Sequence, residues 1–183
     1  MQKKKLILFI DSGDTIIDEA TQIRNDEGYV VKAGFIPGAD EMMKAIYAAG
    51  YTIALVADGE NKSFDNVYEE NGLRYCFVSW VVSETIGVQK PGKEMFQEAM
   101  DQLGLNDGDK HRIVMVGNNL RKDVLGANQF GITSVWIDWS PRYFHEPRSG
   151  AEKPDYTIHT PAELKPLLDT LEAKLEKGEK IKG

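Results

Sequence analysis

An apolar segment that ends directly on an acidic turn constrains the fold of this 183-residue chain more than any other feature. Residues 6–10, Leu-Ile-Leu-Phe-Ile, are followed by Asp11-Ser12-Gly13-Asp14-Thr15. A short, continuous apolar run bounded by turn residues is typical of a strand that is buried on both faces, as the strands of parallel sheets are. Such a strand places Asp11 at the carboxyl edge of the sheet, where open α/β folds bind their ligands.

Apolar, β-branched segments alternate with helical patterns along the rest of the chain. This alternation predicts a Rossmann-like three-layer α/β sandwich with a mostly parallel central sheet. Strands are expected at residues 5–10, 52–57, 78–82, 113–117, 134–137 and 156–158. Helices are expected at residues 41–49, 61–71, 92–103, 121–130 and 161–177, and the tail after the last helix is expected to fray. No repeat or linker divides the chain, so residues 1–183 are expected to form one domain.

Residues 18–36 do not fit this alternation. They carry few helix signals, and Tyr29-Val30-Val31 is suited to one side of a short hairpin. The segment is too short for a second domain, so no large cap domain is expected. It is either a flap over the carboxyl edge of the sheet or a plain surface loop.

Composition narrows the class of protein. The net charge of −7 argues against a general binder of nucleic acid or of anionic membranes. No stretch approaches the roughly 20 apolar residues of a membrane span, and the apolar run after Lys3-Lys4-Lys5 is too short for a signal peptide. The single cysteine, Cys76, cannot form an internal disulfide and is expected to be a small buried hydrophobe. A cytoplasmic protein is expected.

Four segments, each at the end of an expected strand or the start of a helix, resemble the motifs of the haloacid dehalogenase (HAD) superfamily, a group of aspartate-nucleophile phosphatases and their relatives. They are Asp11-Ser12-Gly13-Asp14-Thr15, the strand end Ala57-Asp58-Gly59, Lys90-Pro91, and Gly117-Asn118-Asn119 with Asp123 downstream. Each motif alone is a weak signal, but four in this order indicate the HAD-like fold.

The resemblance implies a mechanism. Asp11 would attack phosphorus and form an aspartyl-phosphate, and Lys90 would neutralise the phosphate and hold Asp11. Because a phosphoryl group beside Asp11 crowds like charges, a divalent cation is needed, and the resemblance implies Mg²⁺ held by the Asp11 carboxylate, the Gly13 carbonyl and the Asn118 side chain. The expected function is a Mg²⁺-dependent phosphoric monoester hydrolase acting on a phosphorylated small molecule.

Other positions have less certain roles by pattern alone. Asp123 either orients the metal site and Lys90 or satisfies a helix dipole. Substrate contacts are expected, beside Lys90, from Ala57, Asp58, Asn119 and Arg142. Arg142 lies in the aromatic segment 139–145, which is either a wall of the binding site or a packed surface loop.

The chain departs from the phosphatase pattern at its first motif. Gly13 stands where that branch has the aspartate that protonates the leaving group, and losing such a group costs roughly 10²–10⁴ in rate. Asp14 lies one position late: it is a catalytic candidate if the turn twists, and otherwise it stabilises the turn. On this reading, replacing Gly13 with aspartate is expected to raise turnover.

Further departures keep other functions open. Ala57 replaces a phosphate-binding Ser or Thr, and Asn118 replaces a metal-binding aspartate, which weakens Mg²⁺ binding. The alternatives are a non-catalytic phosphate-binding relative and a metal-independent dehalogenase-like hydrolase, although the latter encloses its substrate with a helical cap that this chain lacks after Asp18. The resemblance implies that relatives without a cap either accept large substrates or are closed by a partner subunit, so a homo-oligomer is left open.

Overall fold

Six parallel strands form the centre of the molecule. The structure, a computed structural model, describes residues 3–183. The strand order is β5-β4-β1-β6-β7-β8, and every neighbouring pair is parallel. The bounds are β1 Ile7–Ile10, β4 Thr52–Ala57, β5 Ser79–Val82, β6 Ile113–Gly117, β7 Thr133–Ile137 and β8 Tyr156–Ile158. The predicted three-layer sandwich with a parallel sheet is confirmed.

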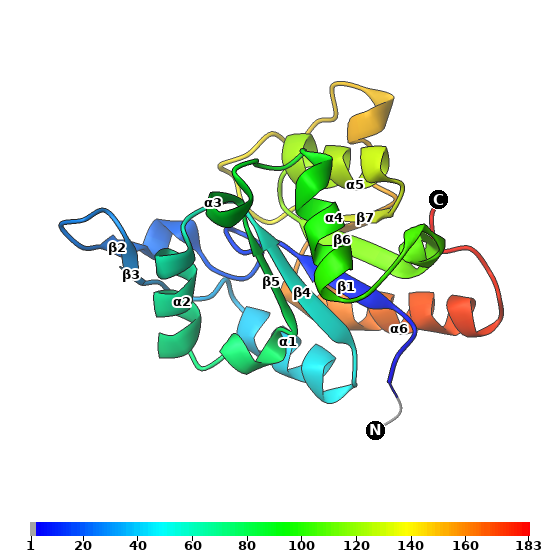
Figure 1. The fold of residues 1–183 in the computed structure, drawn as a ribbon, viewed down its shortest axis with the longest axis horizontal. Coiled ribbons are helices and arrows are strands. Elements are labelled where there is room, and N and C mark those ends of the chain that lie inside the picture. The colour runs from blue at the N-terminus through cyan, green and yellow to red at the C-terminus, as the bar shows by residue number, and fades with distance from the viewer. Residues whose placement is uncertain (1–2) are drawn as a thin grey trace.

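Helices cover both faces of this sheet. They are α1 Ala39–Ala48, α2 Asn61–Glu70, α3 Ser83–Ile86, α4 Lys93–Gln102, α5 Leu125–Phe130 and α6 Leu164–Glu176. In Figure 1, α1 and α6 lie below the sheet, and α4 and α5 lie above it. Side chains of β1 alternate between the two layers: Leu8 and Ile10 belong to the core beneath, and Ile7 and Phe9 to the core above.

The register of the central strands brings their carboxyl ends level. Ile10, the last residue of β1, is paired with Leu55 of β4 on one side and Val116 of β6 on the other. The chain builds β4 and β5 to one side of β1 and β6, β7 and β8 to the other. The strand order therefore reverses at β1, and a ligand site is expected in the crevice there.

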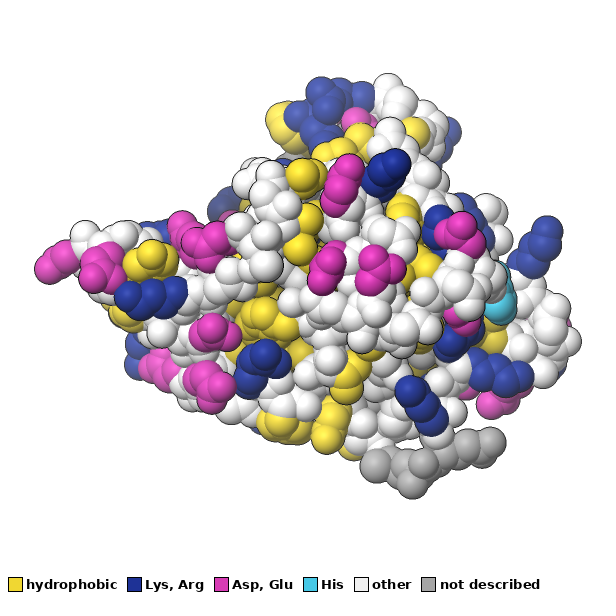
Figure 2. All heavy atoms as spheres, in the orientation of Figure 1, with side chains coloured by type: hydrophobic (Ala, Val, Ile, Leu, Met, Phe, Trp, Pro, Cys, Tyr) yellow, Lys and Arg dark blue, Asp and Glu magenta, His cyan; other side chains and the backbone are white. Residues whose placement is uncertain are grey.

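Residues 18–36 form a short 3-10 turn at Glu19–Thr21 and a two-stranded hairpin, β2 Ile23–Arg24 and β3 Val30–Lys32. The hairpin packs against α2, where the backbone N–H of Val30 donates to Ser63 Oγ at 3.0 Å. Figures 1 and 2 show the hairpin projecting from the body of the molecule beside α2, with acidic and basic side chains around it. No helical cap stands on this segment.

One predicted helix is not uniform. Residues 121–130 begin as a wide π-helical turn, Leu120–Val124, before α5. Two local side-chain bonds accompany this turn: Asn119 Oδ1 accepts from the backbone of Arg121 at 2.9 Å, and Asp123 Oδ2 accepts from the backbone of Asn119 at 2.9 Å. Such turns within helices are frequent at functional sites.

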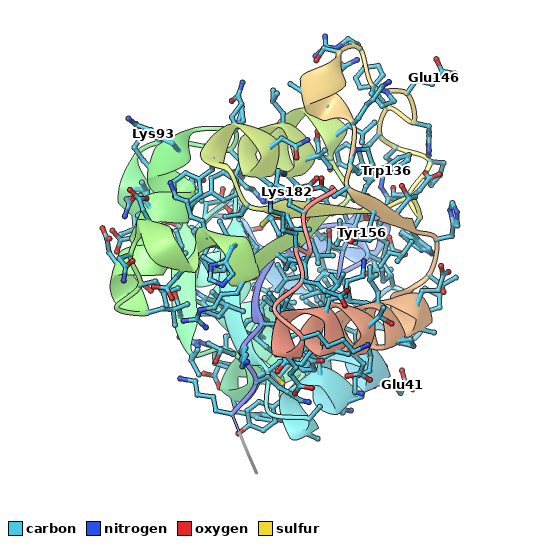
Figure 3. The ribbon with its side chains drawn as sticks, turned by 90° about the vertical axis from the view of Figure 1, so that its right-hand side faces the viewer. Glu41, Lys93, Trp136, Glu146, Tyr156 and Lys182 are labelled. Carbon is cyan, nitrogen blue, oxygen red and sulfur yellow. The ribbon has the colours of Figure 1, made fainter. Side chains whose placement is uncertain are left out.

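The tail after α6 is held against the sheet, so the expectation that it frays is wrong. Ile181 is buried, and its carbonyl accepts a hydrogen bond from Tyr156 Oη at 2.8 Å. Lys182 Nζ donates to the carbonyl of Ile132 at 2.8 Å and pairs with Asp155 at 2.9 Å. Figure 3 shows this segment returning from α6 toward Tyr156 and Lys182.

Within residues 3–183 there is no helix of the length and apolarity that a bilayer crossing requires.

Candidate active site

A buried lysine joins two carboxylates at the carboxyl edge of the sheet. Lys90 Nζ lies 2.7 Å from Asp11 Oδ1 and 2.6 Å from Asp123 Oδ1. Its third donor direction is filled by the carbonyl of Val56 at 2.8 Å. The side chains of Lys90 and Asp123 are each 1% exposed, whereas that of Asp11 is 13% exposed. Asp11 is therefore the member of the cluster that a ligand can reach.

The charges of this cluster shift the pKa values of their neighbours. Burial alone would lower the pKa of the Lys90 ammonium, but the carboxylates of Asp11, Asp123 and Asp58 outweigh it and raise that pKa above its ordinary value. Burial, followed by the charge of Asp11, raises the pKa of Asp123, while the contact with Lys90 opposes the rise. Lys90 is accordingly a fixed positive charge next to the reachable carboxylate.

Local structure explains how these side chains meet. The backbone N–H of Asp11 still donates to Val116 of β6 at 2.9 Å, which continues the ladder one residue beyond β1. Gly117 ends β6, and a Cβ built on it would lie 2.2 Å from Asp123 Cγ. Glycine at this position therefore gives Asp123 the space it needs beside the strand.

Asn118 follows β6 and lies at the same edge. Its Nδ2 is buried and has no hydrogen-bond partner among the described residues. Asp11, the Gly13 carbonyl and the Asn118 amide give a cation three oxygen ligands of which only one is charged, and residues 3–183 hold no cluster of three or more His, Cys, Asp or Glu side chains suited to a metal. The chemistry of this donor set, one carboxylate and two neutral oxygens, fits a magnesium ion that keeps several waters.

The remaining residues expected to touch substrate lie around this edge in different ways. Ala57 is buried at the end of β4. Asp58 accepts from the backbone of Lys90 at 3.0 Å and pairs with Lys122 Nζ at 2.8 Å. Asn119 uses its side chain to cap the following turn. Lys122, which sequence reasoning did not select, offsets the negative charge that Asp58 would present to an anion.

Asp14 and Arg142 are joined to each other, and their ion pairs are with each other and with Asp18 and not with Lys90. Asp14 is fully buried with a left-handed φ of 50°, a conformation that aspartate tolerates better than most residues. Arg142 Nε donates to Asp14 Oδ2 at 2.7 Å, and its Nη2 binds both Asp14 and Asp18. Ser140 Oγ also donates to Asp14 Oδ2, at 2.7 Å. In this arrangement the Asp14 carboxylate and the Arg142 guanidinium serve to tie residues 139–145 to the turn that follows β1, residues 11–15, which we call the first turn.

Glu19 is a carboxylate that no sequence motif indicated. A Cβ built on Gly13 would lie 2.1 Å from Glu19 Oε1, so this carboxylate occupies the space of a side chain at position 13. Its other oxygen, Oε2, accepts a hydrogen bond from Tyr143 Oη at 2.9 Å. Burial raises the pKa of Glu19 above its ordinary value, and the nearby charges of Asp14 and Asp11 add to the rise, whereas the Tyr143 bond opposes it.

A cavity of about 170 Å³ opens beside these groups, between the hairpin and α2. Its polar side is formed by Gly13, Glu19 and Asp58. Its apolar side is formed by Ile17, Val30 and Phe64. Asp11 itself does not line this cavity, but the two residues after it, Ser12 and Gly13, do. A small organic group carried by a ligand at this turn would find both kinds of surface there.

Comparison with known proteins decides the family. A sequence model of haloacid dehalogenase-like hydrolases matches residues 8–137, which span β1 to β7 and include Asp11, Lys90 and Asp123. The chain belongs to the haloacid dehalogenase-like hydrolases. As a member of this family it is similar to Escherichia coli pyrimidine 5'-nucleotidase YjjG, at 31% identity over 73% of this chain and 56% of that protein.

Other relatives of this HAD-like hydrolase differ in chemistry. The (S)-2-haloacid dehalogenase of a Pseudomonas strain is 27% identical over 88% of this chain and 66% of its own length. The HAD-hydrolase YfnB of Bacillus subtilis, solved with magnesium bound, superimposes with a TM-score of 0.73 at 19% identity, over 91% of this chain and 100% of that one. The chain spans little more than half the length of YjjG. The family includes both phosphatases and dehalogenases, so the choice between them depends on the site.

Proposed function

We propose that this HAD-like hydrolase is a Mg²⁺-dependent phosphoric monoester hydrolase that acts through an aspartyl-phosphate on Asp11. The observation that carries the proposal is the Asp11–Lys90–Asp123 cluster. Lys90 binds one oxygen of Asp11 and fixes the carboxylate at the mouth of the crevice, while the protonated ammonium offers positive charge to a phosphoryl oxygen. The similarity to a nucleotidase and to phosphatases agrees with this assignment.

The reaction divides into two displacements. An oxygen of Asp11 attacks phosphorus, the ester P–O bond breaks, and the leaving oxygen takes up a proton. Water then attacks phosphorus, the P–O bond to Asp11 breaks, and inorganic phosphate departs while a base accepts the proton of the water. Asp123 acts through Lys90, because it holds the ammonium in place and does not itself face the crevice.

Magnesium would be held by the Asp11 carboxylate, the Gly13 carbonyl and the Asn118 amide. When bound, it would offset the repulsion between the carboxylate and the phosphoryl oxygens. With Asn118 in place of a charged ligand, the protein itself supplies one negative charge. We therefore propose that the ion binds weakly and that the Lys90 ammonium carries a larger share of the charge compensation.

The test is turnover of 4-nitrophenyl phosphate with and without Mg²⁺. We expect turnover that EDTA abolishes and that Mg²⁺ restores, and we expect Asp11→Asn to remove it while leaving the fold intact. Glu27→Gln, an exposed carboxylate at the tip of the hairpin, is the control variant and should retain full activity. Phosphate binding by an intact protein without any turnover would instead indicate a non-catalytic relative.

A second candidate is the metal-independent hydrolysis of a carbon–halogen bond. It is favoured by the unpaired Asn118 Nδ2, because a buried amide N–H suits an anion such as a halide or a substrate carboxylate. In that reaction Asp11 attacks carbon, halide leaves, and water hydrolyses the resulting ester. Chloride release from (S)-2-chloropropionate in the presence of EDTA, lost in Asp11→Asn, would select this function over the phosphatase.

A further inference from the structure

Hydrolysis of a phosphate ester whose leaving group is an alkoxide requires an acid that can protonate that group. Most carboxylates near Asp11 are already engaged. Asp123 is buried against Lys90, Asp58 is bound by Lys122 and by the backbone of Lys90, and Asp14 is enclosed by Arg142 and Ser140. These groups leave Glu19 as the carboxylate with an oxygen directed toward the first turn.

The position of that oxygen follows from Gly13. The Ser12 side chain is turned toward α2, where its Oγ lies 2.9 Å from Tyr68 Oη. Gly13 follows Asp11 by two residues and lines the same cavity as Glu19. Glu19 Oε1 occupies the space of a side chain at residue 13, so it lies beside the turn that carries Asp11.

Two further contacts hold Glu19 in this place. Tyr143 donates to Oε2 and leaves Oε1 as the oxygen that faces Gly13. The backbone N–H of Glu19 donates to Asp14 Oδ1 at 3.0 Å, which ties the start of the 3-10 turn to the first turn. Glu19 also lines the cavity between the hairpin and α2, which can receive the organic part of an ester held at the first turn.

Resting on the proposed function, we propose that Glu19 is the proton donor to the leaving group, supplied from the segment after the first turn to the space that Gly13 leaves open. In the first displacement the proton moves from the Glu19 carboxyl to the oxygen whose bond to phosphorus breaks. In the second, the resulting carboxylate takes a proton from the attacking water and is restored. Tyr143 is a positioning residue that orients the carboxyl through Oε2.

The decisive variant is Glu19→Gln, which retains an oxygen for the Tyr143 hydrogen bond but cannot transfer a proton. We expect kcat for an alkyl phosphate to fall by roughly 10²–10⁴. With 2,4-dinitrophenyl phosphate, whose leaving group needs no proton, the variant should release a rapid burst of one dinitrophenolate per active site and then turn over slowly. Glu27→Gln, the matched carboxylate on the exposed hairpin, should behave as wild type with both esters.

A rescue experiment tests the shared space directly. Glu19→Ala should lose activity toward the alkyl phosphate, and adding Gly13→Asp should restore part of it, because the new carboxylate fills the space that Oε1 has left. Gly13→Asn in the same background should restore nothing. In the wild-type background Gly13→Asp displaces Glu19 from this space and is expected to lower activity, in contrast to the gain expected from the sequence.

The outcomes separate this inference from the proposed function. If the wild type hydrolyses both esters and Glu19→Gln loses the same factor with each and shows no burst, Glu19 is not the proton donor. Failure of Gly13→Asp to restore Glu19→Ala would likewise contradict it. A wild type that hydrolyses no phosphate ester overturns the proposed function, and this inference with it. Melting temperatures within a few degrees of the wild type establish that each variant is folded.

Discussion

Arg142 and Asp14, 128 residues apart in sequence, form a two-point pair in which Nε donates to Oδ2 at 2.7 Å and Nη2 binds Oδ1. The aspartate is fully buried, whereas the arginine side chain is 37% exposed. Planar guanidinium–carboxylate pairing fixes orientation as well as distance. The pair therefore fastens the segment after β7 to the first turn, and Tyr143 is carried with it to Glu19.

Arg142→Gln is expected to destabilise the protein, because it leaves a buried carboxylate short of two donors. The partial exposure of Arg142 reduces the effect, and we expect a loss of about 1–3 kcal/mol in the free energy of unfolding measured with urea. Asp14→Asn in the same background should recover part of the loss. Lys44→Gln, which breaks an exposed pair with Asp40, should change stability by no more than about 0.5 kcal/mol. An equal loss in the free energy of unfolding for Arg142→Gln and Lys44→Gln would contradict the role of the Arg142 pair.

Lys90→Met is expected to be more severe. It removes the cation between Asp11 and Asp123 and leaves the fully enclosed Asp123 carboxylate without its charge partner. Removing one member of a buried pair costs about 3–5 kcal/mol. Because the penalty comes from the uncompensated carboxylate, Lys90→Met with Asp123→Asn should be more stable than Lys90→Met alone, as urea denaturation of the single and double variants would reveal. A purely additive result would show that the three charges are not coupled.

Asn118→Asp is expected to tighten Mg²⁺ binding. It adds a second charged ligand to a donor set that otherwise has one. A gain of about 1.4 kcal/mol in the free energy of Mg²⁺ binding would lower the dissociation constant tenfold. Calorimetric titration of the wild type and the variant with MgCl₂ measures the difference. Asn106→Asp, in the exposed turn that precedes β6 at the opposite edge of the sheet, adds the same charge away from the site and should leave affinity unchanged. Equal tightening in both variants would mean that net charge, and not coordination, is responsible.

The sheet was predictable because its strands are continuous apolar runs. Residues 52–57 and 113–117 form strands with the expected bounds, since strands buried on both faces leave no ambiguity of register or side. The edge strand at residues 156–158 also has the expected bounds, although only Ile158 in it is buried. The π-helical turn at Leu120–Val124 was not predicted, because it accompanies bonds made by Asn119 and Asp123 and not a propensity. Cys76 is buried, as its apolar surroundings indicated.

The site was predictable to the extent that strand ends define it. Asp11 directly follows β1 and Asp123 lies in the turn that follows β6, so both lie at the edge where these parallel strands end. Lys90 lies in the segment after α3 and meets both of them at this edge. The partner of Arg142 was not predictable, since a sequence shows a charge but not the direction in which a loop turns it. Glu19 and Tyr143 lie in irregular segments with no periodic register, and their meeting depends on the absence of a side chain at Gly13.

The raised pKa of Glu19 predicts that its carboxylate is held at a cost to stability. A carboxyl whose pKa is higher in the folded state favours folding when protonated and opposes it when ionised. Glu19→Gln is therefore expected to raise the melting temperature of the metal-free protein at neutral pH. As the pH falls from the raised pKa toward the ordinary value of 4.5, the wild type takes up the proton in its folded state first, so the difference between the two proteins should shrink and then vanish. Thermal melts in EDTA between neutral pH and pH values below the ordinary pKa measure it. A difference that is independent of pH would show that the glutamine acts through packing and not through charge.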